Sequence, residues 1–174
     1  GLDVVVIERD KRLGGRAMSW TDTVTGDPVH IGPHIFLTEY PNMWALLDVL
    51  GTRDRIVWQE DRFITLADGD EHTVMRGSRL PAPLQFVPSM LASDRMKNVD
   101  VMSNLAVTTY ALQMDERDVL YLDEMNAWAF LRRMGVTKRF IHQFWSFVSM
   151  AIMNVPIELC SAGAIMRFYQ RILG

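Results

Sequence analysis

The sequence contains only one cysteine, Cys160, among 174 residues. A single thiol excludes a disulfide within the chain and a metal cluster held by cysteines. It also fits a reducing compartment. The histidines offer no better metal site, because His30, His72 and His142 are isolated from one another and show no metal-ligand spacing. We therefore predict no metal ion.

A strong charge of one sign is also missing. The chain carries 18 basic and 21 acidic side chains, for a net charge of −3, and it has no run rich in lysine and arginine. Nucleic-acid binding depends on a basic field that neutralises phosphates. The sequence therefore predicts no nucleic-acid partner.

No apolar run is long enough to cross a membrane cleanly, which takes about 20 residues. The longest stretch without Asp, Glu, Lys or Arg covers residues 140–157, and His142, Gln143, Asn154 and Pro156 interrupt it. This length and composition favour a buried helix. With 49% hydrophobic residues, the chain is long enough for one domain with its own core.

Both ends of the sequence indicate an internal fragment of a longer protein. The chain begins at Gly1 instead of Met and enters an apolar run at residues 2–7 without the basic segment of a signal peptide. It stops at Gly174, directly after an apolar-periodic stretch. We expect further coding sequence on both sides.

The first part of the chain shows mainly strand patterns. Residues 2–7 form a continuous β-branched run, which is typical of a strand buried on both faces of a parallel sheet. The dipeptide Asp68-Gly69 indicates a hairpin turn. Pro41 and Gly51 suit the first turn and the end of a helix. Strands are expected at residues 2–7, 17–21, 29–31, 55–59, 63–66 and 71–75, and a helix at residues 41–50.

Beyond Pro83 the apolar periodicity becomes helical. Asp123 and Thr137 are the expected N-caps and Gly135 is an expected C-cap. This order of elements predicts an α/β (α+β) chain, with strands first and a mainly helical second part. The expected helices cover residues 86–91, 96–113, 124–134, 137–153 and 161–173.

Chemistry is indicated by the segment that follows the first expected strand. Glu8 ends that strand, and a carboxylate there can accept hydrogen bonds from both hydroxyls of a ribose. Eight residues later Arg16 follows Gly14-Gly15; paired glycines admit an anionic ligand and a guanidinium can hold phosphate. Separately, these residues fit a solvated strand end and an ordinary turn, but together they predict a nucleotide site. The Gly-rich turn usual about 20 residues before the acid has no room upstream of Glu8, which supports the expected truncation.

Several motifs in the same order resemble one family. Glu8 followed by residues 13–16, Leu-Gly-Gly-Arg, is similar to the second strand and loop of FAD-binding amine oxidases and phytoene desaturases. The chain resembles FAD-dependent phytoene and carotene desaturases and is also similar to hydroxysqualene dehydroxylase. The other matching stretches are Gly32-Pro33-His34-Ile35-Phe36, Tyr40-Pro41-Asn42, residues 80–84, Trp128 to Val136 and Met153 to Ala162.

The resemblance implies a partial Rossmann-like FAD-binding region at residues 1–40, followed by a helical substrate-binding region at residues 41–174. The sequence departs from the family pattern at Pro33, because proline has no backbone N–H to donate. We name no catalytic residue, since His34 suits a structural role as well as a chemical one. The cofactor-binding residues implied are Glu8 at the ribose, Arg9 through its backbone, Gly14, Gly15 and Arg16 in the loop, and His34, Ile35 and Tyr40 at the flavin.

The function implied is desaturation of a long polyisoprenoid such as phytoene or a carotene, with FAD accepting hydride and a quinone or oxygen as the final acceptor. Peripheral membrane attachment is expected, on the cytoplasmic side or in a plastid, and this fragment alone is expected to be inactive. Two related alternatives remain, a squalene-pathway flavoenzyme and a flavin amine oxidase. A truncated, non-catalytic helical lipid-binding module is the alternative from another class.

Overall fold

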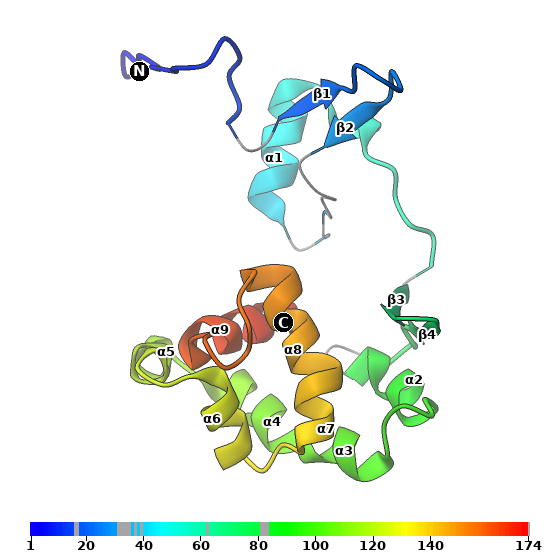
Figure 1. The fold of residues 1–174 in the computed structure, drawn as a ribbon. Coiled ribbons are helices and arrows are strands. Elements are labelled where there is room, and N and C mark those ends of the chain that lie inside the picture. Colours follow the sequence, from blue (N-terminus) through cyan, green and yellow to red (C-terminus); the bar gives the residue numbers. More distant parts are fainter. Residues whose placement is uncertain are drawn as a thin grey trace. The chain divides into compact units, whose positions relative to one another are not determined.

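The computed structural model describes residues 1–15, 18–30, 36, 38, 40–61, 63–80 and 84–173 (Figure 1). These form two compact units, residues 1–58 and residues 59–174. The described residues contain short helices and two antiparallel two-stranded sheets. The mixed composition agrees with the expected class, whereas the described part shows no parallel Rossmann sheet. The expected functional boundary after residue 40 stays a prediction, because packing units do not assign function.

The apolar run at residues 2–7 has no regular secondary structure, so the prediction of a strand there is wrong. Leu2, Val5 and Ile7 are 92%, 84% and 93% exposed. A strand is stabilised by hydrogen bonds to a neighbouring strand, and no described strand pairs with this run. β-Propensity alone does not supply those bonds.

The expected hairpin that follows is confirmed within the described residues. Strands β1 (Ser19–Thr21) and β2 (Pro28–His30) pair antiparallel. The Asp22 carboxylate closes the turn, because it accepts hydrogen bonds from the N–H groups of Val24 and Thr25 at 2.8 Å each. These backbone bonds, with Thr25 first, lower the pKa of Asp22 from its ordinary value.

Helix α1 (Pro41–Leu50) has the predicted bounds. Gly51 ends it in the left-handed region, with φ of 63°. The helix buries Trp44, whose ring lies 4.9 Å from that of Trp58. The strand expected at residues 55–59 is wrong: a 3₁₀ turn, η1 (Arg53–Arg55), precedes irregular chain, and no described strand pairs with it.

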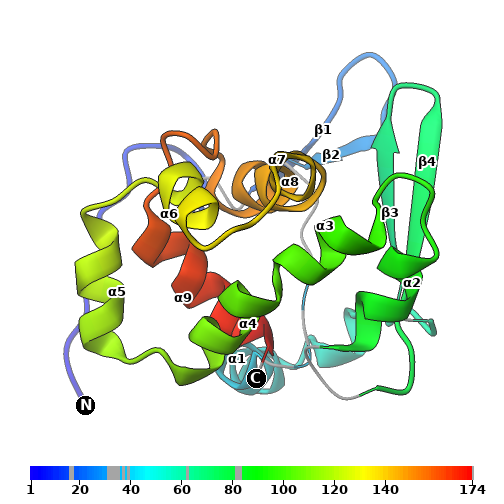
Figure 2. The ribbon, with the colours of Figure 1, turned by 90° about the horizontal axis from the view of Figure 1, so that it is seen from below.

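The second unit begins with the hairpin of β3 (Phe63–Asp68) and β4 (Glu71–Arg76), as predicted. Gly69 takes a φ of 60° in its turn. A 3₁₀ turn, η2 (Leu84–Phe86), leads into α2 (Val87–Leu91), which packs on β4 (Figure 2). The Ser89 hydroxyl accepts a hydrogen bond from the Arg76 N–H at 3.0 Å and so joins helix to strand.

The helix expected at residues 96–113 is divided in two at Asn104. Helix α3 (Asn98–Ser103) ends there and α4 (Leu105–Gln113) begins. The buried Asn104 side chain accepts a hydrogen bond from the indole N–H of Trp145 at 2.8 Å and donates to the Tyr169 hydroxyl at 3.1 Å. Periodicity could not predict this division, because the partners lie 41 and 65 residues away.

The helix expected at residues 124–134 also has different bounds in the structure. Asp123 ends helix α5 (Glu116–Asp123), so its prediction as an N-cap is wrong. Helix α6 (Ala127–Arg133) begins instead after Asn126, whose side chain accepts the Ala129 N–H at 2.7 Å. The sequence contained the missed signal for α5, because Asp115 and Asp118 have capping-box spacing. Gly135, with φ of 86°, directly follows the α6 C-cap Met134.

Residues 138–153 form one helical stretch, as predicted, with Thr137 as its N-cap. Two segments are π-helical, at Ile141–Trp145 and Ser149–Met153, on either side of α8 (Ser146–Val148). The short helix α7 (Lys138–Phe140) begins the stretch. Such wider turns redirect side chains and interrupt a simple helical period.

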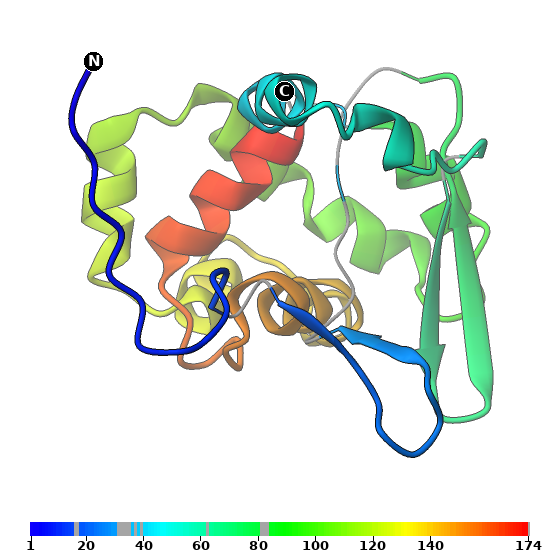
Figure 3. The same cartoon turned by 90° about the horizontal axis from the view of Figure 1, so that it is seen from above.

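Helix α9 (Ala162–Leu173) packs against α4, α5 and α6 and forms the centre of the second unit (Figures 2 and 3). Its contact with α5 is close: a Cβ on Gly163 would lie 2.5 Å from the Val119 carbonyl oxygen. Among the described helices, none is long and apolar enough to cross a membrane. The largest fully buried side chains are Trp145, Phe140, Leu122, Leu131, Ile141, Ile157, Ile165 and Met166.

Candidate flavin-binding segment

Glu8 and Arg9 lie in the exposed, irregular segment at the start of the chain. The Glu8 carboxylate accepts a hydrogen bond from the Asp10 N–H at 2.9 Å, which turns the chain just after the acid. The Arg9 side chain is 94% exposed and lies 3.8 Å from the Asp10 carboxylate. Both backbone and carboxylate are therefore accessible to a ligand at this point.

The two glycines of the motif both take positive φ, 117° at Gly14 and 52° at Gly15. Residues that carry a side chain rarely adopt this backbone conformation, which explains why glycine occupies both positions. No described atom lies within 4 Å of where a Cβ on Gly15 would be. Successive turns of this kind can present backbone N–H groups to an anion.

The remaining predicted cofactor residues are only partly accounted for. Arg16, His34 and Ile35 lie outside the described residues. Tyr40 is the residue before α1; its carbonyl accepts the N–H groups of Met43 and Trp44, at 3.0 and 3.1 Å, and its side chain is 41% exposed. Glu8, Arg9 and the two glycines thus lie on one exposed, irregular segment, whereas Tyr40 precedes a helix and accepts its first backbone hydrogen bonds.

The chemistry of these groups fits the nucleotide end of a flavin cofactor. A carboxylate can accept two ribose hydroxyls and a positive-φ glycine pair can face a phosphate. The supporting sheet that a dinucleotide fold places under such an acid is not formed by the described residues. The segment therefore supplies groups that suit a nucleotide, but no sheet of described residues lies beneath them. In the described part of the chain, no group of three His, Cys, Asp or Glu side chains could hold a metal ion.

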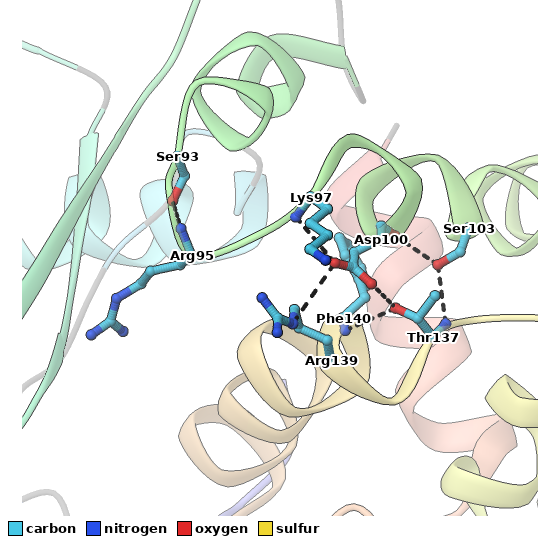
Figure 4. A network of polar contacts seen from close by, with 8 residues as sticks. All are labelled: Ser93, Arg95, Lys97, Asp100, Ser103, Thr137, Arg139 and Phe140. Carbon is cyan, nitrogen blue, oxygen red and sulfur yellow. Dashed lines mark hydrogen bonds and ion pairs between the residues drawn. The ribbon is translucent and has the colours of Figure 1, made fainter.

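A polar network that the sequence patterns did not predict joins α3 to α7 (Figure 4). The buried Asp100 carboxylate accepts hydrogen bonds from the Thr137 hydroxyl at 2.7 Å and the Lys97 N–H at 3.0 Å. The Thr137 bond comes first among the causes that lower the pKa of Asp100. Arg139 lies farther away, with Nε 4.0 Å from the carboxylate. The Lys97–Asp100 and Thr137–Phe140 links have local spacing that a sequence can indicate, whereas the bond from Thr137 to Asp100 joins residues 37 positions apart.

A second buried polar group lies among aromatic rings. The Tyr169 hydroxyl contacts the Thr108 hydroxyl at 2.9 Å and accepts from Asn104. The rings of Tyr169 and Trp145 are 4.6 Å apart and edge-on. Burial raises the pKa of Tyr169. These groups are mutually satisfied within the second unit and have a structural role.

The relationship to other proteins follows from comparison along the whole chain. Residues 1–170 match the family described as flavin containing amine oxidoreductase. The chain belongs to this family. The resemblance seen in the sequence is thereby confirmed, and membership of a flavin-containing family supports FAD as the cofactor.

Curated proteins are similar to this chain over nearly all of its length. It is 28% identical to the 15-cis-phytoene desaturase of Capsicum annuum over 95% of its own length and 30% of that protein. It is 25% identical to the 15-cis-phytoene desaturase of Synechococcus elongatus, over 97% of this chain and 36% of that one. The zeta-carotene desaturase of Capsicum annuum is 22% identical, over 97% and 30%. The chain spans about a third of the length of these relatives.

Proposed function

We propose that the protein is an FAD-dependent desaturase of a long isoprenoid hydrocarbon of the phytoene or carotene type. The observation that carries the proposal is the match of residues 1–170 to a flavin oxidoreductase family, combined with phytoene and zeta-carotene desaturases as relatives over 95–97% of the chain. The segment of Glu8, Gly14 and Gly15 supports it, because its groups suit the sugar and phosphates of the cofactor.

In this proposal the residues of the first unit hold FAD, which takes up hydride from the substrate when bound. Glu8 accepts hydrogen bonds from the ribose, and the Arg9 backbone lies beside it. Gly14, Gly15 and Arg16 face the phosphates. His34, Ile35 and Tyr40 line the flavin and orient the substrate rather than move a proton.

We also propose a quinone or oxygen as the electron acceptor and peripheral attachment to a membrane, in a plastid or at a cytoplasmic face. An isoprenoid hydrocarbon dissolves in lipid, so its enzyme must reach a bilayer. Exposed apolar side chains near basic ones can provide shallow attachment. Leu120 and Tyr121 on α5 are 71% and 63% exposed, and α5 also carries the exposed Arg117.

The decisive experiment is turnover by the full-length protein with FAD and a quinone in lipid vesicles. We expect loss of phytoene and appearance of a product with additional conjugated double bonds, measured by absorbance and chromatography. A hydroxysqualene-type substrate and a primary amine serve as the comparison substrates. Turnover of either of these without turnover of phytoene or a carotene, with FAD bound, would reject the proposal in favour of the corresponding relative.

The role of Glu8 can be tested separately through cofactor affinity. Glu8→Gln removes the charge while keeping the shape, and we expect about tenfold weaker FAD binding, as for loss of a hydrogen bond to a charged group. The measurement is flavin fluorescence during titration of the apoprotein. Glu60→Gln, at an exposed acid without a described partner, is the matched control and should leave the affinity unchanged.

A further inference from the structure

Helices α3 and α4 carry apolar side chains on two opposite sides. Toward the core they present Val101, Val107 and Ala111, each at most 7% exposed. A helix that is hydrophobic all round is typical of a segment buried on every side. We call the other side the outward face. Its large apolar side chains, each more than half exposed, are Val99, Met102, Leu105 and Leu112.

The outward face also lacks charge. Residues 101–114, which cover most of α3 and all of α4, contain no Asp, Glu, Lys or Arg. The two acids that border this run have partners in the protein, because Asp100 is bonded to Thr137 and Asp115 caps α5. A contiguous exposed apolar patch of this kind marks an interaction surface.

A groove of about 630 Å³ lies on the outward face. Its apolar walls come from Met102, Leu105 and Ala106, and from Met134 at the end of α6. Figure 2 shows α3 leading directly into α4, so the groove spans both helices. Methionine side chains are flexible and polarisable, and they adapt to an apolar occupant of irregular shape.

The hydroxyl groups that line the groove are all bonded within the protein. Ser103 donates to the Asp100 carbonyl at 2.6 Å, and Thr109 donates to the Leu105 carbonyl at 3.0 Å. The Tyr110 hydroxyl donates to the Asp118 carboxylate at 3.3 Å. A protein interface of ordinary size makes about ten hydrogen bonds, whereas lipid hydrocarbon makes none. The uncharged, internally bonded groove is therefore complementary to hydrocarbon.

We propose that the outward face of α3 and α4 docks on a lipid bilayer, with Met102 and Leu105 inserted among the acyl chains. Because the face is uncharged, attachment depends on apolar burial and not on anionic headgroups. The inference rests on the proposed function in one respect, since a substrate dissolved in lipid requires contact with a bilayer.

The test is co-sedimentation of the full-length protein with phosphatidylcholine vesicles, without FAD or phytoene. Leu105→Gln keeps a residue of similar helix propensity and removes an inserted apolar side chain, so we expect about tenfold weaker partitioning. Combining it with Met102→Gln should weaken partitioning further. Leu159→Gln makes the same change at a 76% exposed position outside both helices and should have no effect. Phosphatidylglycerol vesicles and about 1 M salt should leave retention unchanged.

Three results would overturn the proposal. The first is no retention of the wild type on phosphatidylcholine vesicles, or retention that needs phosphatidylglycerol and disappears at high salt. The second is a loss of retention in Leu120→Gln on α5 with none in Leu105→Gln, which would place the contact on α5 and leave the proposed function standing. The third is an unfolding midpoint or an oligomeric mass that Leu105→Gln lowers without vesicles, because another part of the protein or a second copy then covers the face.

Leu112→Gln repeats the test on the same face if Leu105→Gln does not fold. Vesicle retention and desaturation are separate measurements, so the two proposals can fail independently. Retention that follows the outward face in a protein that does not desaturate phytoene would support the docking face and reject only the proposed function.

Discussion

The two packing units differ in how many of their apolar side chains they bury. In residues 59–174 the helices bury a continuous core around Trp145, Phe140 and Leu131, each at most 2% exposed. In residues 1–58 Trp44 is the one buried apolar residue among those described, while the run at residues 2–7 is exposed. The helical unit therefore contains its own stabilising contacts, whereas the apolar run finds none within the described chain.

This difference shows that burial, more than intrinsic propensity, decides which strong sequence patterns form structure. The run at residues 2–7 has high β-propensity and stays irregular. The polar-capped helix α5 forms because α9 packs against it. Four substitutions test how much of the stability comes from the core of the helical unit.

The largest effect is expected for Trp145→Ala. Trp145 is fully buried, contacts the rings of Phe144 and Tyr169, and donates its indole N–H to Asn104. Truncation leaves a cavity and an unpaired amide, so we expect a loss of about 3–5 kcal/mol in the free energy of unfolding. Urea denaturation of the full-length protein measures it. Val5→Ala, at 84% exposure, is the comparison; an equal loss there would show that residues 2–7 are buried after all.

Gly163→Ala should give the next largest effect. The new Cβ would lie 2.5 Å from the Val119 carbonyl oxygen and 2.9 Å from the Asp123 nitrogen. Both are backbone atoms, so α5 and α9 must separate, at a cost of about 1–3 kcal/mol. The thermal unfolding midpoint is the measurement. Ala164→Ser, at the exposed neighbour, should change it little.

Thr137→Val tests the link between α3 and α7. Removing the hydroxyl deprives the Asp100 carboxylate of a hydrogen bond and the helix of its cap, at a cost of about 1–2 kcal/mol near pH 7. Because the folded-state pKa of Asp100 is depressed, its contribution is present above the ordinary value of 3.8 and is lost as the pH falls through the folded-state value.

The pH dependence of the urea midpoint therefore distinguishes this mechanism. The difference between wild type and Thr137→Val should shrink as the pH is lowered below about 4, where the carboxylate becomes protonated in both. Thr109→Val, at an exposed hydroxyl bonded only to a helix carbonyl, is the control. A difference that stays constant down to pH 2 would show that the lost helix cap or packing, and not the carboxylate, accounts for the loss.

The smallest effect is expected for Glu116→Gln. The Glu116 carboxylate pairs with both terminal nitrogens of Arg167 and joins α5 to α9, but it is 77% exposed. Solvent and salt screen such pairs, so the unfolding midpoint should shift slightly at low salt and not at all near 1 M salt. A salt-independent shift would mean that the pair is protected from solvent.

The sequence alone determined the local and the family-specific features. Helix α1, both hairpins and the Thr137 cap follow from turn residues, capping residues and periodicity, which act over a few neighbouring residues. The ordered motifs identified the flavin oxidoreductase family, because residues that suit one ligand keep their spacing. Glu8, Arg9, Gly14, Gly15 and Tyr40 keep their cofactor roles as predictions, as do Arg16, His34 and Ile35 outside the described residues.

Features that depend on residues far apart in the sequence emerge from three-dimensional packing. It divided the helix expected at residues 96–113, since Asn104 bonds to Trp145 and Tyr169, and it left residues 2–7 without a sheet. It also brought Met134 of α6 beside Met102 and Leu105 in one apolar groove. The physical reason is common to all three: buried hydrogen bonds, strand pairing and groove walls need groups from separate segments, and no local pattern specifies which segments meet.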